Sequence, residues 1–200
     1  PLEEGISGPA YIFTGTYDNG VIEILQSGSY HLTDDLTSSL TDGTSGSHTF
    51  AIKISAPDVV LDGNGKTVTV SSSAQNADPI QINGSGNTVQ NFAEIEASTN
   101  TGCYGIYVNR TSYAGEDAII QNNIITGGID GIRAGGTVGK NIGIINNTIS
   151  GFINNGIYIN SSGLISGNTI TGKGGVNLLS SDDMTITGNN ITATLLAQGI

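Results

Sequence analysis

The second half of the chain repeats a short pattern of apolar residues, glycine and asparagine. Five segments begin with a Gly-Ile or Gly-Val pair, at positions 105, 131, 156, 175 and 199. A six-residue element that starts and ends with isoleucine runs in phase with them. Its fourth residue is Asn122, Asn147, Asn168 or Asn189, which gives steps of 25, 21 and 21 residues. A period in the low twenties, built from short β-type segments, is typical of a solenoid of stacked coils.

The segments that follow each Gly-Ile pair alternate as half-buried strands do. The alternation predicts that Ile157 and Ile159 point inward and that Tyr158 points outward. The same phase predicts further inward residues, which are Ile52, Ile54, Ile80, Ile82, Ile106, Val108, Ile132 and Ala134. Inward side chains of successive coils then stack about 4.8 Å apart, the spacing of hydrogen-bonded strands.

The recurrent asparagines predict a structural ladder. A buried amide without partners costs about 1–3 kcal/mol, so amides at one regular position must pair along the axis. We therefore interpret Asn122, Asn147, Asn168 and Asn189 as a ladder that holds a tight turn.

The outward positions of the same strands form a second column. It contains Lys53, Gln81, Tyr107, Arg133, Tyr158 and Asn177. Within it the Arg133 guanidinium is expected to lie between the rings of Tyr107 and Tyr158, an arrangement worth roughly 0.5–1 kcal/mol per exposed contact. Two interpretations stay open: a stabilising surface stack, or a stripe that faces a sugar or another partner.

The first 50 residues do not show the repeat, and we interpret residues 1–50 as an N-terminal cap. Residues 21–25 and 30–32 flank a Gln-Ser-Gly-Ser stretch and predict a hairpin. Residues 36–47, rich in Ser, Thr and Gly, predict a loop. Residues 51–200 are expected to form one continuous domain of about six to seven coils. The sequence ends on another Gly-Ile pair, and an uncovered last coil would be open to edge pairing. Either the protein was cut at this point, or something else covers that end.

Charge and cysteine content exclude several function classes. Six Lys and Arg against 17 Asp and Glu give a net charge of −11, which argues against nucleic acid and anionic lipid as partners. The acidic surface serves either solubility or divalent-cation screening. No run of 18 apolar residues occurs, so no membrane insertion is expected. The single cysteine, Cys103, is expected to be a buried thiol.

Several segments resemble a known family. Residues 28–36, 52–54 and 59–68, together with the Ile-x-Gly-Asn-x-Ile repeats, resemble right-handed parallel β-helix proteins of the pectin-lyase-like superfamily. The nearest kind is the NosD-type repeat proteins of archaeal, especially methanogen, cell surfaces. The resemblance covers residues 28–200. It implies an all-β, right-handed, single-stranded parallel β-helix. It also implies an extracellular or cell-surface protein. The start at Pro1 fits either a cytoplasmic protein or a mature exported chain whose signal peptide has been removed, and the resemblance favours the exported chain.

The superfamily includes enzymes, but their residues do not match this chain. The hydrolases use an Arg-x-Lys motif with Asp and His on adjacent coils, and no Arg-x-Lys occurs here. The chain has two histidines, His31 and His48, both near its start. Together with Cys103 and Met184 they form no recognisable metal cluster. We therefore expect no catalytic residues, no metal and no cofactor.

Five Asn-x-Ser/Thr sequons are candidate glycosylation sites, as expected for an exported protein. Their asparagines are Asn83, Asn109, Asn146, Asn160 and Asn190.

Three functions follow from these observations. The first is a structural surface protein whose copies associate by β-edge or coil stacking into a filament, sheath or layer. The alternative is a module that binds or acts on carbohydrate, with surface glycans as partners of the Tyr107–Arg133–Tyr158 stripe. A metal-handling accessory of the NosD type ranks last.

Overall fold

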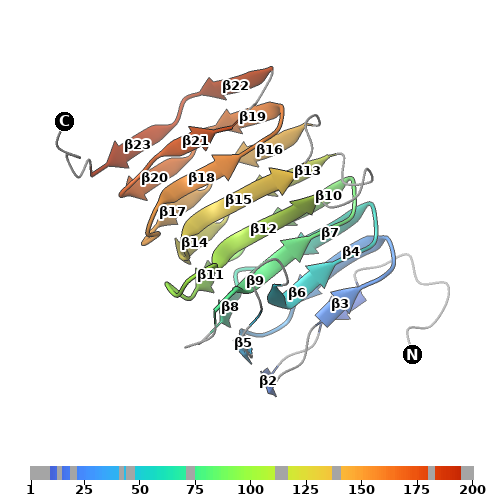
Figure 1. The fold of residues 1–200 in the computed structure, drawn as a ribbon. Coiled ribbons are helices and arrows are strands. Elements are labelled where there is room, and N and C mark those ends of the chain that lie inside the picture. Colours follow the sequence, from blue (N-terminus) through green and yellow to red (C-terminus); the bar gives the residue numbers. More distant parts are fainter. Residues whose placement is uncertain are drawn as a thin grey trace.

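The computed structural model describes residues 10–12, 15–18, 22–40, 43, 48–70, 75–110, 117–136, 141–179 and 183–194. These residues form 23 strands in three parallel sheets, and the strands of successive coils lie side by side along one axis (Figure 1). Within the described ranges no helix is long and apolar enough to cross a membrane.

We name the sheets A, B and C. Sheet A contains β1 (Ala10–Ile12), β4 (Gly28–Leu32), β7 (Val59–Asp62), β10 (Asn87–Gln90), β13 (Ala118–Gln121), β16 (Ile142–Ile145), β19 (Gly163–Ser166) and β22 (Met184–Thr187). Sheet B contains β2 (Gly15–Asp18), β5 (Leu36–Ser39), β8 (Thr67–Val70), β11 (Glu94–Ala97), β14 (Ile124–Gly127), β17 (Thr148–Ser150), β20 (Thr169–Gly172) and β23 (Asn190–Ala193). Sheet C contains β3 (Ile22–Ile24), β6 (Thr49–Ile54), β9 (Ala77–Ile82), β12 (Tyr104–Arg110), β15 (Asp130–Gly136), β18 (Asn155–Ile159) and β21 (Val176–Leu178).

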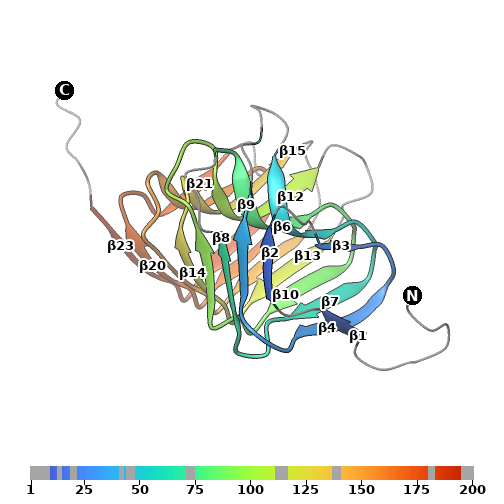
Figure 2. The ribbon, with the colours of Figure 1, turned by 90° about the horizontal axis from the view of Figure 1, so that it is seen from below.

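Each coil contributes one strand to each sheet in turn. Strands β13, β14 and β15 form one such coil, and neighbouring strands within each sheet pair in parallel, for example β13 with β16. The three sheets surround one interior (Figure 2). The described strands make seven coils of three strands and an eighth represented by β22 and β23. The fold is the expected right-handed parallel β-helix.

The interior consists of stacked apolar columns, as the alternation predicted. In sheet C, Ile80 pairs with Ile106 and Ile106 with Ile132, and all three are fully buried. Sheet B carries an equivalent column of Leu36, Val68, Ile95, Ile125, Ile149, Ile170 and Ile191. Each coil therefore buries its apolar side chains against the coils on either side, which supplies most of the burial in a solenoid.

The Gly-Ile repeat has a packing reason. In these strands two consecutive residues face the interior, as Gly131 and Ile132 do in β15. A Cβ atom added at Gly131 would lie 2.3 Å from Cγ2 of Ile149, and one at Gly156 would lie 2.3 Å from Cγ2 of Ile170. Glycine is required because the isoleucine column of sheet B approaches the backbone of sheet C closely.

The asparagine ladder exists, but one of its predicted members is wrong. The Nδ2 and backbone N–H groups of Asn147 donate to Oδ1 of Asn168, at 3.0 and 2.8 Å. Asn168 donates in the same way to Asn189. On the other side, Oδ1 of Asn147 accepts from Asn123, not from Asn122, at 3.1 Å. Residues Asn123, Asn147 and Asn168 are buried, as such a ladder requires.

Backbone conformation explains the shift of one residue. Asn122 is exposed and has φ +56°, and Asn146 holds the same turn position with φ +54°. Gly167 occupies that position in the next coil, with φ +66°. Glycine and asparagine both tolerate this left-handed conformation, so the two residues alternate there. In the pair Asn122-Asn123, the first residue makes the turn and the second enters the ladder.

The expected N-terminal cap is also wrong, because the coils begin earlier. Strands β3 and β4 do not form a hairpin: β3 pairs in parallel with β6, and β4 pairs in parallel with β1 and β7. Residues 36–39 form β5 rather than a loop, whereas residues 41–42 and 44–47 lie outside the described residues. Coil lengths are irregular here, since Tyr30 pairs with Leu61 and Leu61 with Val89. A repeat of about 21 residues is therefore invisible in this half of the sequence.

Substituting the close-packed glycines tests this packing. We expect Gly131→Ala to lower the free energy of unfolding by about 2–3 kcal/mol, because the added methyl group overlaps Ile149 and the Gly156 carbonyl. Gly135→Ala, in the same strand, is the matched control: its Cβ would meet no atom of the described residues within 4 Å. Urea unfolding of both variants measures the difference. Equal midpoints for the two variants would contradict the proposed close approach.

Candidate functional site

The outward column of sheet C has the predicted register. Tyr107 pairs with Arg133 and Arg133 with Tyr158, and the column continues through Lys53, Gln81 and Asn177. Gln81, although in this column, is only 2% exposed. In strands β6, β9, β12, β15 and β18 of sheet C, two consecutive inward residues precede the member of this column, and the residue before those two faces outward again. These earlier residues form a second outward column beside the first. It contains Phe50, Asp78, Tyr104, Asp130 and Asn155.

Three rings gather where the two columns meet. The His48 and Tyr104 rings stack with centroids 5.2 Å apart and an interplanar angle of 22°. The Tyr107 ring lies 5.0 Å from His48 and 5.3 Å from Tyr104, tilted against both. Such offset or tilted pairs are each worth about 0.5–1.5 kcal/mol beyond the area they bury.

Arg133 extends this cluster to the next coil. Its guanidinium carbon lies 4.3 Å from the Tyr158 ring centroid and 4.9 Å from that of Tyr104. The sequence predicts that the Arg133 guanidinium lies between the rings of Tyr107 and Tyr158. Tyr158 is one of the two rings, but the other is Tyr104, so the prediction of Tyr107 is wrong. The reason is the second outward column, which brings Tyr104 next to Asp130. Nη1 of Arg133 donates to Oδ2 of Asp130 at 2.9 Å.

Two buried carboxylates hold the cluster from beneath. Oδ1 of Asp78 accepts from the Tyr104 backbone N–H at 2.7 Å, and its Oδ2 lies 2.8 Å from Nδ1 of His48. Oδ1 of Asp130 accepts from the Asn155 side chain at 2.8 Å. Asp78 is fully buried and Asp130 is 1% exposed. Both carboxylates therefore depend on these partners, since an unpaired buried charge is strongly destabilising.

Burial also changes how these groups titrate. It raises the pKa of Asp78, against the opposing effects of His48, the Tyr104 amide and Arg133. It likewise raises the pKa of Tyr104 and of Tyr107, so both phenols stay neutral at ordinary pH. Burial acts to lower the pKa of Arg133, but the hydrogen bond to Asp130 and nearby groups raise it overall. Arg133 is therefore a permanent cation.

We name His48, Tyr104, Tyr107, Arg133 and Tyr158 the sheet-C patch. The tyrosines are half-buried, so each is fixed on one side and partly open on the other. Fixed aromatic surface beside fixed polar groups is an arrangement suited to recognition rather than to packing alone. Sequence reasoning found Tyr107, Arg133 and Tyr158 but missed His48, Asp78, Tyr104 and Asp130. The signal in the sequence is the position just before each pair of consecutive inward residues in sheet C. Residues 78, 104 and 130 occupy that position.

Fold and site together define a parallel β-helix protein with an aromatic and charged patch on one sheet. A sequence model of the family described as periplasmic copper-binding protein (NosD) matches residues 36–200. The chain belongs to this NosD family.

A comparison with solved structures gives the same fold. The crystal structure of the Dettilon tailspike protein (gp208) is similar to this chain with a TM-score of 0.62 and 14% sequence identity. The similar region covers 92% of this chain and 40% of the tailspike chain. A comparison with curated proteins gave no match.

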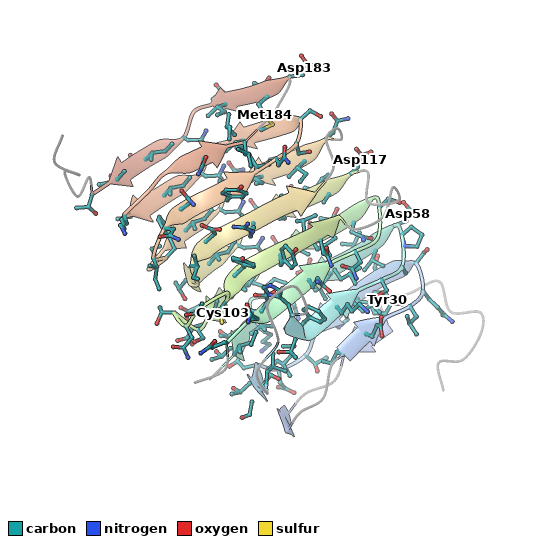
Figure 3. All side chains as sticks on the ribbon, viewed as in Figure 1. Tyr30, Asp58, Cys103, Asp117, Asp183 and Met184 are labelled. Atoms are coloured by element: carbon teal, nitrogen blue, oxygen red, sulfur yellow. The ribbon has the colours of Figure 1, made fainter. Side chains whose placement is uncertain are left out.

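The family description names copper, so we tested the residues against a copper site. In the part of the chain that the structure describes, no group of three His, Cys, Asp or Glu side chains lies close enough to hold a metal. Cys103 is fully buried before β12, whereas Met184 begins β22, several coils away (Figure 3). Burial raises the pKa of Cys103, which disfavours the thiolate that binds metal. The described residues do not fit copper.

The five sequons differ in accessibility. The side chains of Asn146 and Asn190 are exposed. Asn83, Asn109 and Asn160 are partly buried, and the Oδ1 atoms of Asn83 and Asn160 are buried. Attachment of a glycan requires an accessible side-chain amide, so the geometry favours Asn146 and Asn190.

Proposed function

We propose that this protein is a cell-surface protein that binds neutral carbohydrate through the sheet-C patch. Of the functions expected from the sequence, the geometry of the described residues favours this one. The observation that carries the proposal is the cluster of Tyr104, Tyr107 and Tyr158 around a fixed guanidinium. The periplasmic description of the family supports a location outside the cytoplasm.

Aromatic rings and sugars are complementary in charge distribution. The face of a phenol ring carries partial negative charge, and the C–H groups of a sugar ring carry partial positive charge. The Tyr hydroxyls, the guanidinium and the Asn155 amide can exchange hydrogen bonds with sugar hydroxyls. Tyr107 and Tyr158 lie two coils apart in one column, so a chain of several sugar units can follow the stack.

Charge favours neutral over acidic glycans. Arg133 is already paired with Asp130, and Asp78 lies in the same cluster. The chain as a whole carries a net charge of −11, which repels polyanions at low ionic strength.

The test is binding of soluble neutral and acidic polysaccharides by affinity electrophoresis and calorimetry. We expect Tyr158→Ala to weaken binding of a neutral polysaccharide about tenfold, or ~1.4 kcal/mol, because it removes the ring that lies 4.3 Å from the Arg133 guanidinium. Asn177→Ala is the matched control, since Asn177 is exposed and pairs with Tyr158 in the same column. Unchanged binding by Tyr158→Ala, or preference for acidic polysaccharides, would contradict the proposal.

Self-association is a second proposal, supported by the last described coil. Its inward-type residues Ile186 and Ile191 are 44% and 41% exposed. Their equivalents one coil earlier, Ile165 and Ile170, are fully buried. We propose that another copy of the chain covers these residues by continuing the parallel pairing.

Sedimentation velocity over a concentration series tests this association. We expect Ile186→Lys with Ile191→Lys to keep the protein monomeric, because two charges would be buried at the contact. Ile119→Lys, at a residue 40% exposed on the flank of sheet A, should leave association unchanged. A monomer at every concentration of the unsubstituted chain would contradict self-association.

A further inference from the structure

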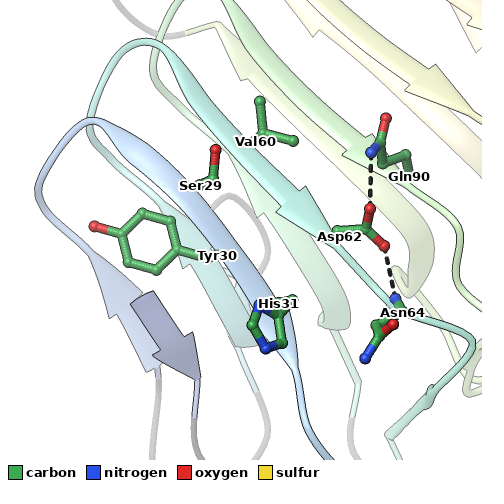
Figure 4. A pocket seen from close by; sticks show the side chains of 7 residues that line it. All are labelled: Ser29, Tyr30, His31, Val60, Asp62, Asn64 and Gln90. Carbon is green, nitrogen blue, oxygen red and sulfur yellow. Dashed lines mark hydrogen bonds between the residues drawn. The ribbon is translucent and has the colours of Figure 1, made fainter. Parts of the chain in front are cut away.

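A pocket on the outer face of sheet A lies apart from the sheet-C patch. Its volume is about 370 Å³, within the range of small-molecule sites. Strand β4 contributes Ser29, Tyr30 and His31, strand β7 contributes Val60 and Asp62, and Gln90 and Asn64 complete the wall (Figure 4). The pocket therefore spans three successive coils.

Asp62 is the centre of a hydrogen-bond network that fixes its carboxylate. Oδ2 accepts from Nε2 of Gln90 at 2.8 Å and from Nδ2 of Asn91 at 2.9 Å. Oδ1 accepts from the backbone N–H of Asn64 at 2.7 Å. Gln90 is itself oriented, because its Oε1 accepts from Gln121 of the next coil at 2.8 Å. The direction of each amide in the wall is thus determined.

The network keeps Asp62 ionised. Burial acts to raise the pKa of Asp62, but the hydrogen bonds from Gln90, Asn64 and Asn91, with the nearby charge of His31, lower it overall. Each carboxylate oxygen can accept two hydrogen bonds, and Oδ1 receives one from the protein. An oriented acceptor with remaining capacity therefore lies in the pocket, whose wall also contains the Ser29 hydroxyl.

The chemistry of the wall selects one class of ligand. An anion would be repelled by Asp62 and by the net charge of −11. A metal ion would need more ligands than the described part of the chain brings together. A neutral polyhydroxyl ring satisfies the carboxylate, the hydroxyl and the amides, and Val60 offers an apolar surface for its C–H groups.

We propose that this pocket binds a single neutral sugar unit, with Asp62 and Ser29 accepting hydrogen bonds from its hydroxyls and Val60 beneath its ring. The site is separate from the sheet-C patch and does not depend on that proposed function.

The two histidines of the chain make the test direct, because His31 lines the pocket and His48 belongs to the sheet-C patch. Their imidazole ¹H NMR signals, assigned with His31→Gln, report the two sites separately. The probes are methyl glucoside, methyl galactoside, methyl mannoside and N-acetylglucosamine at millimolar concentrations, with glucuronate as the charged comparison. We expect at least one neutral sugar to shift the His31 signal saturably, and glucuronate to bind more weakly than methyl glucoside.

Variants that fill the pocket test whether the shift of the His31 signal comes from sugar bound there. Val60→Phe should fill it and weaken sugar binding at least tenfold, whereas Thr88→Phe, its partner in the next coil of the same column, should not. Ser29→Phe blocks the pocket from the neighbouring strand and serves if Val60→Phe does not fold. Sugars that shift only His48 would support the sheet-C patch and overturn the pocket proposal. No shift of His31 with any neutral sugar, unchanged binding by the pocket-filling variant, or equal binding of glucuronate would also overturn it.

Discussion

The side-chain ladder at one corner of the coils fixes how each coil sits on the next. Asn123, Asn147, Asn168 and Asn189 each use an amide to bond the neighbouring coil, and they also satisfy buried carbonyls, as Asn147 does for Ile120 at 2.9 Å. Every buried polar group at this corner depends on the asparagine of the next coil being in register. A slip of one residue would move every inward isoleucine to the outer face, so the ladder and the apolar columns specify the same register.

The register between neighbouring coils brings the residues of the surface sites together. Tyr104, Arg133 and Tyr158 come from three coils and meet only because Tyr104 lies opposite Asp130, and Arg133 opposite Tyr158. The pocket over Asp62 has the same origin, since His31, Asp62 and Gln90 occupy one column of sheet A. A solenoid therefore converts a local repeat into long-range side-chain clusters without any long loop. The groups that vary within a column form the surface clusters, and the groups that repeat stabilise the stack of coils.

Sequence reasoning predicted the elements that repeat and missed those that do not. The inward columns and the outward column from Lys53 to Asn177 follow from period-two alternation and were predicted correctly. The sequence pattern places Asn122 in the ladder because a turn asparagine and a ladder asparagine are adjacent and identical. The N-terminal segment resembles a hairpin in sequence because its coil lengths vary, so that only the strand pairing reveals the coils. His48 and Asp78 could not be joined from sequence, since His48 lies just before β6 and Asp78 lies in the second outward column, which a simple alternation does not predict.

The stability of two asparagine variants tests the register most directly. Asn147→Ala removes an amide that pairs with both neighbouring coils and leaves buried groups of Asn123 and Ile120 unpaired, so we expect a loss of about 3 kcal/mol in the free energy of unfolding. Asn122→Gly changes an exposed residue at φ +56°, a conformation that glycine adopts freely, and should leave the free energy of unfolding within about 0.5 kcal/mol. Urea unfolding of the two variants should therefore separate them clearly. A larger loss for Asn122→Gly than for Asn147→Ala would contradict this register and the surface sites that depend on it.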